Sequence, residues 1–171
     1  MKTVYLVRHG ENVANITKEL SHRIVDYSLT DKGNEQARQT AEHFAGIPID
    51  AVFSSPLKRA RETARIIAER LQLPVRTDER LRELNVGTLE TEGELEERWR
   101  VHHEIVDRWR AGESEAAFPG GEDHHELTER CRDAMTDVLR HTTSTAIVVA
   151  HAGIFRFALS AVAEWGIPDP G

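Results

Sequence analysis

Short apolar runs alternate with longer amphipathic stretches along this chain of 171 residues. The apolar runs are rich in β-branched and aliphatic residues, a composition typical of strands buried in a sheet. They occupy residues 4–7, 50–53 and 145–150, with a weaker run at 74–77. The pattern therefore predicts short strands at these positions, and the run T-A-I-V-V-A at 145–150 is the clearest of them.

The stretches between these runs carry apolar residues at helical spacing. Thr30 or Asp31 can cap the first helix, and Gly46 and Pro48 end it. The second helix follows Pro56, and its buried face is expected to hold Leu57, Ala60, Ala64, Ile67, Ala68 and Leu71. Further helices are expected over 92–112, from the break at 118–122 to about 141, and from 154 onward. Residues 12–28 are expected to form a polar loop.

Strands that alternate with helices predict an α/β fold with a parallel, doubly wound sheet. The expected architecture is a three-layer α/β/α sandwich whose central sheet is mostly parallel. We find no internal repeat, low-complexity tract or linker, so residues 1–171 are expected to form a single domain. Residues 92–118 are highly charged and are expected to form a cap segment over the edge of the sheet.

Composition and charge exclude several classes of function. The net charge of −7 makes nucleic acid an unlikely partner. There is no apolar stretch near the roughly 18 residues that a membrane span needs, and no signal-peptide pattern, so no membrane partner is expected. The single Cys131 cannot form an internal disulfide, which fits the cytoplasm, and we expect it to pack in the core. The oligomeric state stays open, with a homodimer among the options.

Polar side chains follow three of the predicted strands at the point where each strand ends. Arg8 and His9 follow the first, and Ser54 and Ser55 end the second, with Arg59 one helical turn later. His151 follows the last strand. In a parallel sheet these ends meet at one edge, where open α/β sheets bind their ligands. Two Arg and two His beside a helix N-terminus describe a site for a dianion such as phosphate.

An imidazole that faces a bound phosphate can also react with it. If its free nitrogen is unprotonated, it can attack phosphorus and carry the phosphoryl group as phosphohistidine. Neighbouring guanidinium groups favour the neutral imidazole, because they repel a second positive charge.

Four segments together resemble the histidine phosphatase superfamily, which includes the cofactor-dependent phosphoglycerate mutases. They are R-H-G-E at 8–11 followed by Asn15, S-S-P-L-K-R-A-R-E-T-A at 54–64, L-R-E-L-N-V-G at 81–87 and A-H-A-G at 150–153. The resemblance extends from residue 3 to about 157, in the family's order and spacing. P-G-G-E at 119–122 is also similar to the small broad-specificity and α-ribazole-type phosphatases.

The resemblance implies a phosphoglycerate mutase-like fold and a role for each matching residue. His9 would be the nucleophile, and Glu83 stands where the family keeps its proton donor. Arg8, Arg59 and His151 would bind the transferring phosphoryl group, with Asn15 as an accessory phosphate ligand. The implied activity is a metal-independent phosphomonoesterase that hydrolyses small phosphorylated metabolites, with no cofactor and no metal ion.

The chain departs from the family pattern in places. Leu89-Glu90-Thr91 stands where a Trp followed by Glu-Gly is common, Ala152 replaces a common Gly, and Asn12 a common Thr or Ser. The chain ends at 165–171, where relatives usually continue with further strands, so C-terminal strands are expected to be absent or missing.

Alternative interpretations remain open at this stage. A phosphoglycerate mutase is the nearest, although the middle segment lacks the paired-Arg stretch associated with mutases. A non-catalytic phosphoester-binding module and a metal site built on His9 and His151 are the others. The adjacent pairs His102-His103 and His124-His125 are expected on solvated helix surfaces, although His125 could reach a substrate from the P-G-G-E loop.

Overall fold

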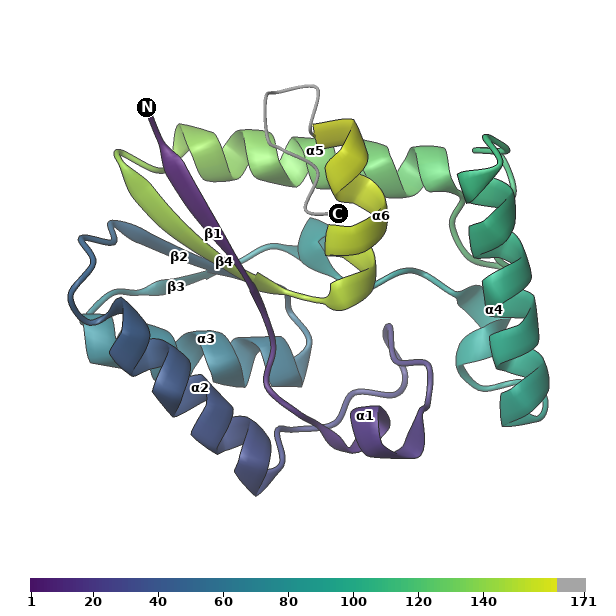
Figure 1. Cartoon of the computed structure of the whole chain (residues 1–171), viewed down its shortest axis with the longest axis horizontal. Helices are drawn as coiled ribbons and strands as arrows, with labels where there is room; N and C mark the ends of the chain where they lie inside the picture. The colour runs from purple at the N-terminus through teal and green to yellow at the C-terminus, as the bar shows by residue number, and fades with distance from the viewer. Residues whose placement is uncertain (163–171) are drawn as a thin grey trace.

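The computed structural model describes residues 1–162, and its centre is a parallel sheet (Figure 1). The strands are β1 (Thr3–Arg8), β2 (Ala51–Ser54), β3 (Val75–Thr77) and β4 (Thr145–Ala150), in the order β1-β4-β2-β3. Every pair is parallel, with Val7 of β1 and Ser54 of β2 both in register with Val149 of β4. The predicted α/β fold with a parallel sheet is confirmed.

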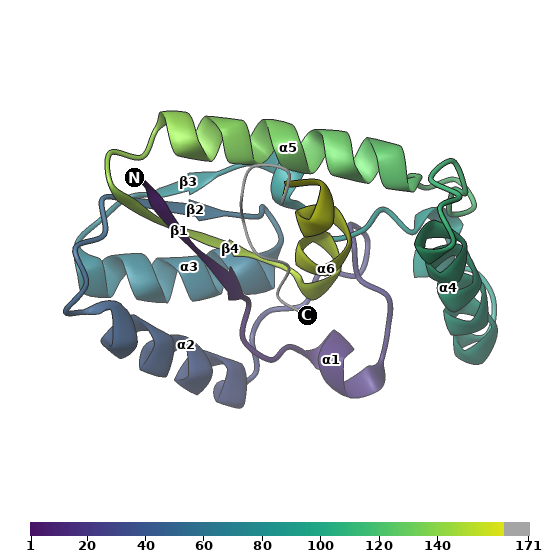
Figure 2. The ribbon, with the colours of Figure 1, turned by 45° about the horizontal axis from the view of Figure 1, so that its top comes forward.

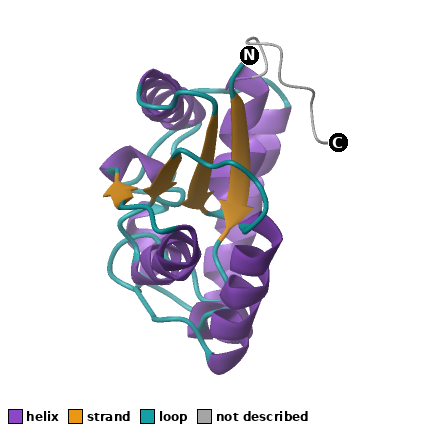
Figure 3. Ribbon diagram, turned by 90° about the vertical axis from the view of Figure 1, so that its left-hand side faces the viewer, coloured by secondary structure: helices purple, strands orange, loops and turns teal. Residues whose placement is uncertain are grey.

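Helices cover both faces of the sheet, which gives the three layers (Figures 2 and 3). One face is covered by α2 (Asp31–Phe44) and α3 (Lys58–Leu71), and the other by α5 (His124–Arg140) and α6 (Ala152–Val162). Residues of β4 alternate between the two layers. Ile147 and Val149 pack with α2 and α3, whereas Ala146, Val148 and Ala150 pack with α5 and α6.

A strand covered on both faces is buried along its length, and β4 shows this, because residues 146–150 are wholly inaccessible to solvent. This explains why T-A-I-V-V-A gave the clearest strand signal. Cys131 of α5 is also buried in the α5–α6 layer, so the prediction that it packs in the core is confirmed.

Two elements lie to one side of the sandwich, beyond the carboxyl ends of the strands (Figure 1). They are the short helix α1 (Val13–Thr17) and the long helix α4 (Leu95–Arg110). The indole Nε1 of Trp99 donates to the carbonyl of Lys18 at 2.6 Å, and this bond ties α4 to the end of α1. Two short 3₁₀ turns, Glu79–Leu81 and Gly87–Glu90, connect β3 to α4.

The structure differs from the predicted elements at two places. Residues 12–28 were expected to form a loop throughout, but Asn12 and Asn15 form a reciprocal capping box that stabilises α1. Five residues are too few to show a helical period. Helix α6 begins at Ala152 and not at Ile154, because the carboxylate of Glu83 accepts bonds from its first N–H groups. The prediction about the chain end at 165–171 lies outside the described residues.

No helix within residues 1–162 combines the length and the hydropathy needed to cross a bilayer.

Candidate active site

The sheet order brings the polar ends of three strands together. Because β4 lies between β1 and β2, His151 emerges between His9 and Ser55. The ring centroids of His9 and His151 are 5.2 Å apart, and His151 Nε2 lies 2.7 Å from Ser55 Oγ. Backbone bonds hold this edge in register, since the N–H of His9 donates to Ala150 and that of Ser55 to Val149.

The hydrogen bonds of His9 define its tautomer. Nδ1 lies 2.7 Å from the carbonyl of Gly10, which can only accept, so Nδ1 carries the proton. Nε2 accepts from Arg59 Nε at 3.1 Å and therefore holds a lone pair. Burial and the charges of Arg59 and Arg8 lower the pKa of His9 to about 3. His9 is thus a neutral imidazole whose Nε2 can act as a nucleophile near pH 7.

Arg59 is buried, and a loop fixes its guanidinium. Nη1 donates to Ser21 Oγ and Nη2 to the carbonyl of Ser21, both at 2.8 Å. The nearest carboxylate oxygen, on Asp26, is 4.0 Å from Nη1. The guanidinium is therefore positioned beside His9 without a close neutralising partner, so much of its charge remains available to an anion.

The loop that holds Arg59 is itself fixed by one carboxylate oxygen. Glu90 Oε1 accepts the backbone N–H groups of residues 22–25, at 2.6 to 3.0 Å. Glu90 is 2% exposed. From the sequence, residues 89–91 stand out only as a departure from the family pattern, and this role of Glu90 is not predicted. A buried carboxylate needs partners, but nothing in the sequence shows that a loop about 65 residues earlier supplies them.

His151 occupies an unusual environment, because it is wholly buried and does not line the cavity. Burial and the neighbouring charges of Arg59 and His9 keep its pKa well below the usual value, so the ring is neutral. Its Nδ1 has no hydrogen-bond partner among the described residues.

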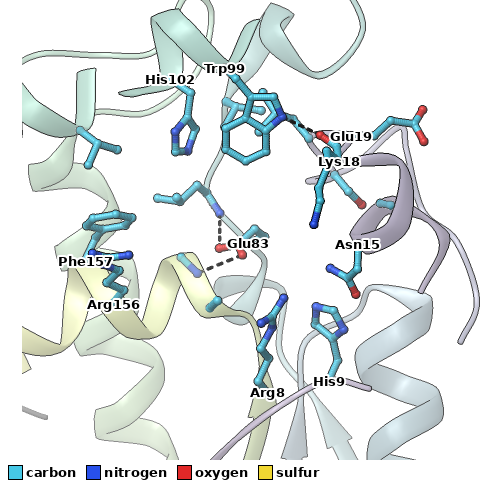
Figure 4. Close-up of a pocket in the computed structure, with 18 of the residues that line it drawn as sticks. Arg8, His9, Asn15, Lys18, Glu19, Glu83, Trp99, His102, Arg156 and Phe157 are labelled. Carbon is cyan, nitrogen blue, oxygen red and sulfur yellow. Dashed lines mark hydrogen bonds between the residues drawn. The ribbon is translucent and has the colours of Figure 1, made fainter. Parts of the chain in front are cut away.

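The other predicted site residues line a cavity of about 640 Å³ in front of His9 (Figure 4). Arg8 is exposed at the end of β1 and has no ion pair within residues 1–162. Asn15 lies next to His9 on the cavity wall. Its Oδ1 accepts from the backbone of Asn12, which leaves its amide NH₂ free to donate to a ligand.

Glu83 lies in the same cavity and caps helix α6 (Figure 4). Oε1 accepts from Ile154 and Leu84, at 2.9 and 3.0 Å, and Oε2 accepts from Gly153 at 3.0 Å. A carboxylate oxygen has two acceptor positions, so Oε2 keeps one that the backbone does not use. Oε2 is therefore the atom able to carry a proton while the contacts to α6 persist.

A partly buried ion pair holds the segment that carries Glu83. Arg130 of α5 binds both oxygens of Glu122 at 2.7 Å, and its Nη atoms also donate to the carbonyls of residues 80, 82 and 83. Glu122 is the last residue of the P-G-G-E motif, so this motif shapes the site without lining the cavity.

The far side of the cavity is formed by helices α4 and α6. Its walls include Trp99, His102, His103, Val106, Arg110, Arg156 and Phe157, together with Lys18 after α1. None of these residues is predicted from the sequence as a ligand contact, because their positions depend on how α4 and α6 pack.

The expectation that His102-His103 is solvated surface was wrong for His102. This side chain is only 9% exposed, stacks on Phe118 with ring centroids 5.3 Å apart, and lines the cavity. Burial and the charge of His103 lower its pKa to about 4, and its Nδ1 has no partner among the described residues. His102 shares the inner face of α4 with Trp99 and Val106, at spacings of three and four, which the sequence could have revealed.

The second pair also differs between its members. His124 is half-buried, and its Nε2 lies 2.8 Å from the carbonyl of Phe157. His125 is exposed and does not line the cavity, so the idea that it reaches a substrate is not supported. Within residues 1–162 no three His, Cys, Asp or Glu side chains are grouped as metal ligands.

Comparison with known proteins places this geometry in a family. The model of the histidine phosphatase superfamily (branch 1) matches residues 4–170. The chain belongs to the histidine phosphatase superfamily. It is 38% identical over 157 residues to a protein of Escherichia fergusonii named "Probable phosphoglycerate mutase GpmB", covering 88% of this chain and 70% of that protein.

Solved structures of superfamily proteins share the fold. Bacillus stearothermophilus YhfR has a TM-score of 0.82 at 27% identity, covering 98% of this chain and 86% of that one. The alpha-ribazole phosphatase from Shigella flexneri has a TM-score of 0.75 at 26% identity, covering 96% and 84%. The superfamily resemblance expected from the sequence is therefore confirmed, and relatives named as mutase and as phosphatase both occur.

Proposed function

We propose that this protein is a metal-independent phosphomonoesterase that works through a phosphohistidine on His9. The observation that carries the proposal is the neutral His9, whose Nε2 lone pair adjoins the buried guanidinium of Arg59. Membership of the superfamily supports the same chemistry.

The first step transfers the phosphoryl group to His9. The lone pair on Nε2 forms the N–P bond while the bond from phosphorus to the ester oxygen breaks, and the electron pair of that bond leaves with the oxygen. Arg59 and Arg8 neutralise the charge that builds on the phosphoryl oxygens, and the amide of Asn15 donates to one of them. The bond from Arg59 Nε to His9 exchanges for one to the phosphoryl group.

Glu83 acts as the general acid in the first step and as the general base in the second. Oε2 gives its proton to the departing alkoxide, which becomes the product alcohol. In the second step the carboxylate accepts a proton from water as the water oxygen attacks phosphorus, and the N–P bond breaks to regenerate neutral His9. Phosphate and alcohol are the products, and no co-reactant besides water is needed.

His151 contributes a hydrogen-bond donor in this proposal. With Ser55 Oγ–H donating to His151 Nε2, the proton of the neutral ring is on Nδ1, which has no partner in the described part of the chain. A buried unpaired donor costs about 1–3 kcal/mol, so it is expected to be satisfied by a ligand. The ring is wholly buried in this structure and its centroid is 5.2 Å from that of His9, so we propose that a phosphoryl group entering beside His9 opens this contact and accepts from Nδ1.

Trapping of the intermediate tests the proposal. Rapid-quench labelling with a radioactive phosphomonoester should give an acid-labile, base-stable phosphoenzyme in the wild type and none in His9→Ala. His43→Ala is the matched control, because His43 is exposed on α2 and far from the cavity lining. Label found on Ser54 or Ser55 would show that the mechanism is wrong.

Chelation tests the absence of a metal step. Activity should survive EDTA, because guanidinium groups supply the positive charge that a metal would otherwise bring. Vanadate should inhibit in competition with phosphate, since it can adopt a trigonal-bipyramidal form like the transition state. Loss of activity with EDTA and its recovery with zinc or magnesium would favour the metal alternative.

Phosphoglycerate mutase activity is the second candidate, and the relatives named GpmB favour it. A mutase must return the phosphoryl group to a sugar acid before water reaches phosphohistidine. The two activities separate in one assay, in which 3-phosphoglycerate gives either 2-phosphoglycerate or glycerate and phosphate. A predominance of 2-phosphoglycerate would replace the phosphatase proposal.

A further inference from the structure

The cavity is positively charged although the chain as a whole is acidic. Its lining includes five cations against two carboxylates, whereas the chain has 29 acidic and 22 Lys or Arg residues. The cations are Arg8, Lys18, Arg59, Arg110 and Arg156, and the carboxylates are Glu19 and Glu83. Arg8 and Arg59 adjoin His9, so three cations remain that the phosphoryl group does not account for.

Two of these remaining cations converge on one aromatic ring. The guanidinium carbons of Arg110 and Arg156 lie 6.0 and 5.6 Å from the centroid of Phe157. They come from different elements, the last turn of α4 and the first turns of α6. Figure 4 shows Arg156 and Phe157 across the cavity from His9, on the far side of Glu83.

Little negative charge opposes this pair. Arg110 Nη1 binds Asp107 at 2.7 Å, but both side chains are more than half exposed, and such pairs contribute little. Arg156 has no ion pair or hydrogen bond to another described residue. Both guanidinium groups lie at the ring of Phe157, so an anion that binds beside this ring is attracted by both positive charges.

Apolar side chains form part of the cavity wall. Leu84, Val106 and the indole of Trp99 line it, together with the neutral ring of His102, while Glu83 lies between the two cationic ends (Figure 4). His102 is 9% exposed, and its Nδ1 has no hydrogen-bond partner within residues 1–162, so this wall also offers one polar contact.

We propose that the substrate is a phosphomonoester whose alcohol carries a second anionic group, held by Arg110 and Arg156 across an apolar spacer. This inference rests on the proposed function for the phosphoryl end. It defines a class of doubly anionic substrates and assigns two specificity residues on helices α4 and α6.

Matched pairs of esters test the proposal. One series consists of phosphate monoesters of ω-hydroxycarboxylic acids of increasing chain length, and the other of the corresponding uncharged carboxamides. At the best length kcat/KM should be about tenfold higher for the acid, mainly through KM, because a charged group gains stronger hydrogen bonds than a neutral one. A third series that ends in a second phosphate shows which anion is preferred.

Substitutions locate the source of the preference. Arg156→Gln and Arg110→Gln should each reduce the acid-to-amide ratio toward one, because kcat/KM for the acid should fall by a larger factor than kcat/KM for the amide. Arg108→Gln is the control, because Arg108 lies on α4 but pairs with Glu113 and does not line the cavity. A ratio near one at every length in the wild type would overturn the proposal, as would an equal effect of Arg108→Gln.

Binding separates this inference from the proposed function. Calorimetry with non-hydrolysable phosphonates of both series measures the preference without turnover. Tighter binding of the acid that depends on Arg156 would support the inference even if no ester is hydrolysed, which would refute the phosphatase proposal alone. Equal binding of acid and amide would overturn the inference whatever the activity.

Discussion

The two ends of the cavity are built in different ways. At the phosphoryl end His9 and His151 follow directly from strands of one sheet, Arg59 lies in the first turn of α3, and all three side chains are buried. At the opposite end Arg110 and Arg156 project from helices, and both are exposed. The first end is held by backbone register and hydrogen bonds, whereas the second depends on how α4 and α6 pack.

This difference indicates how the chemistry and the specificity are divided. The nucleophile His9 and its neighbour His151 are attached to the sheet, and Arg59 and Glu83 are fixed beside them by hydrogen bonds, so the reacting groups keep their distances. Groups that recognise the rest of a substrate lie on helices, where a substitution changes a contact without disturbing the sheet. We therefore expect substitutions at the phosphoryl end to affect all substrates, and those at the opposite end to affect only some.

The largest effect is expected from Arg59→Ala. It removes a fixed cation that stabilises charge on the phosphoryl oxygens, so kcat/KM should fall by about a hundred- to a thousandfold. An alkyl phosphate and nitrophenyl phosphate should lose similar factors, since that charge does not depend on the leaving group. Arg61→Ala, exposed on the same helix, is the control. Unequal losses for the two esters would contradict this role.

A loss that depends on the leaving group is expected from Glu83→Gln. For an alkyl phosphate, kcat/KM should fall on the order of a hundredfold, because its alkoxide needs a proton. Nitrophenyl phosphate leaves as a stabilised phenolate and should lose much less. The amide NH₂ of Gln would also face the N–H of Gly153, so the melting temperature should be measured alongside. Equal losses of kcat/KM for the two esters would mean that Glu83 caps α6 but does not protonate the leaving group.

A smaller effect of the same kind is expected from Gly153→Ala. A Cβ at this position would overlap with Glu83 Oε1 and Leu84 Cδ1, so the carboxyl must move. We expect about a tenfold loss with the alkyl phosphate and little change with nitrophenyl phosphate. Gly46→Ala is the matched control, since a Cβ there meets no atom within 4 Å. No difference between the two variants would mean that the position of Glu83 is not critical.

The smallest expected effect is a loss of folding stability when the pH is lowered. His9 and His102 have pKa values lowered from 6.5 to about 3 and about 4, and that of His151 is also lowered. Between about pH 4 and 6.5 the unfolded chain therefore binds protons that the folded chain refuses, so stability falls as the pH drops below 6.5. Each such histidine contributes up to about 1.4 kcal/mol per pH unit.

Urea unfolding at several pH values measures this slope. His102→Phe keeps an aromatic ring against Phe118 but removes one titrating group, so its slope between pH 5 and 6.5 should be smaller than that of the wild type. His43→Phe, at an exposed position, should leave the slope unchanged. A flat stability profile in the wild type would show that the buried histidines are not neutral as described.

The same division explains what the sequence could predict. Strand runs that end in Arg8-His9, Ser54-Ser55 and His151 imply a shared edge, because parallel strands end on the same side. The contacts of Glu90 with residues 22–25, and the capping of α6 by Glu83, join segments far apart in the chain, and no local pattern encodes them. Because residues 92–118 are highly charged, the face of α4 that packs inward, on which His102 is buried, is not predicted from composition.

Helix α6 couples the position of the proposed proton donor to the recognition of the rest of the substrate. Its first N–H groups hold Glu83, and one turn later it presents Arg156 to the far end of the cavity. A rotation of this helix that retuned substrate choice would also displace the carboxyl. On the opposite wall, α4 is bonded to Lys18 through Trp99 but makes no hydrogen bond to Glu83 among the described residues, and Arg110 bonds only to Asp107 of its own helix. A new substrate preference is therefore more easily obtained, in evolution or by engineering, through changes in α4. In α6, only exchanges of side chains that leave the helix in place keep Glu83 in position.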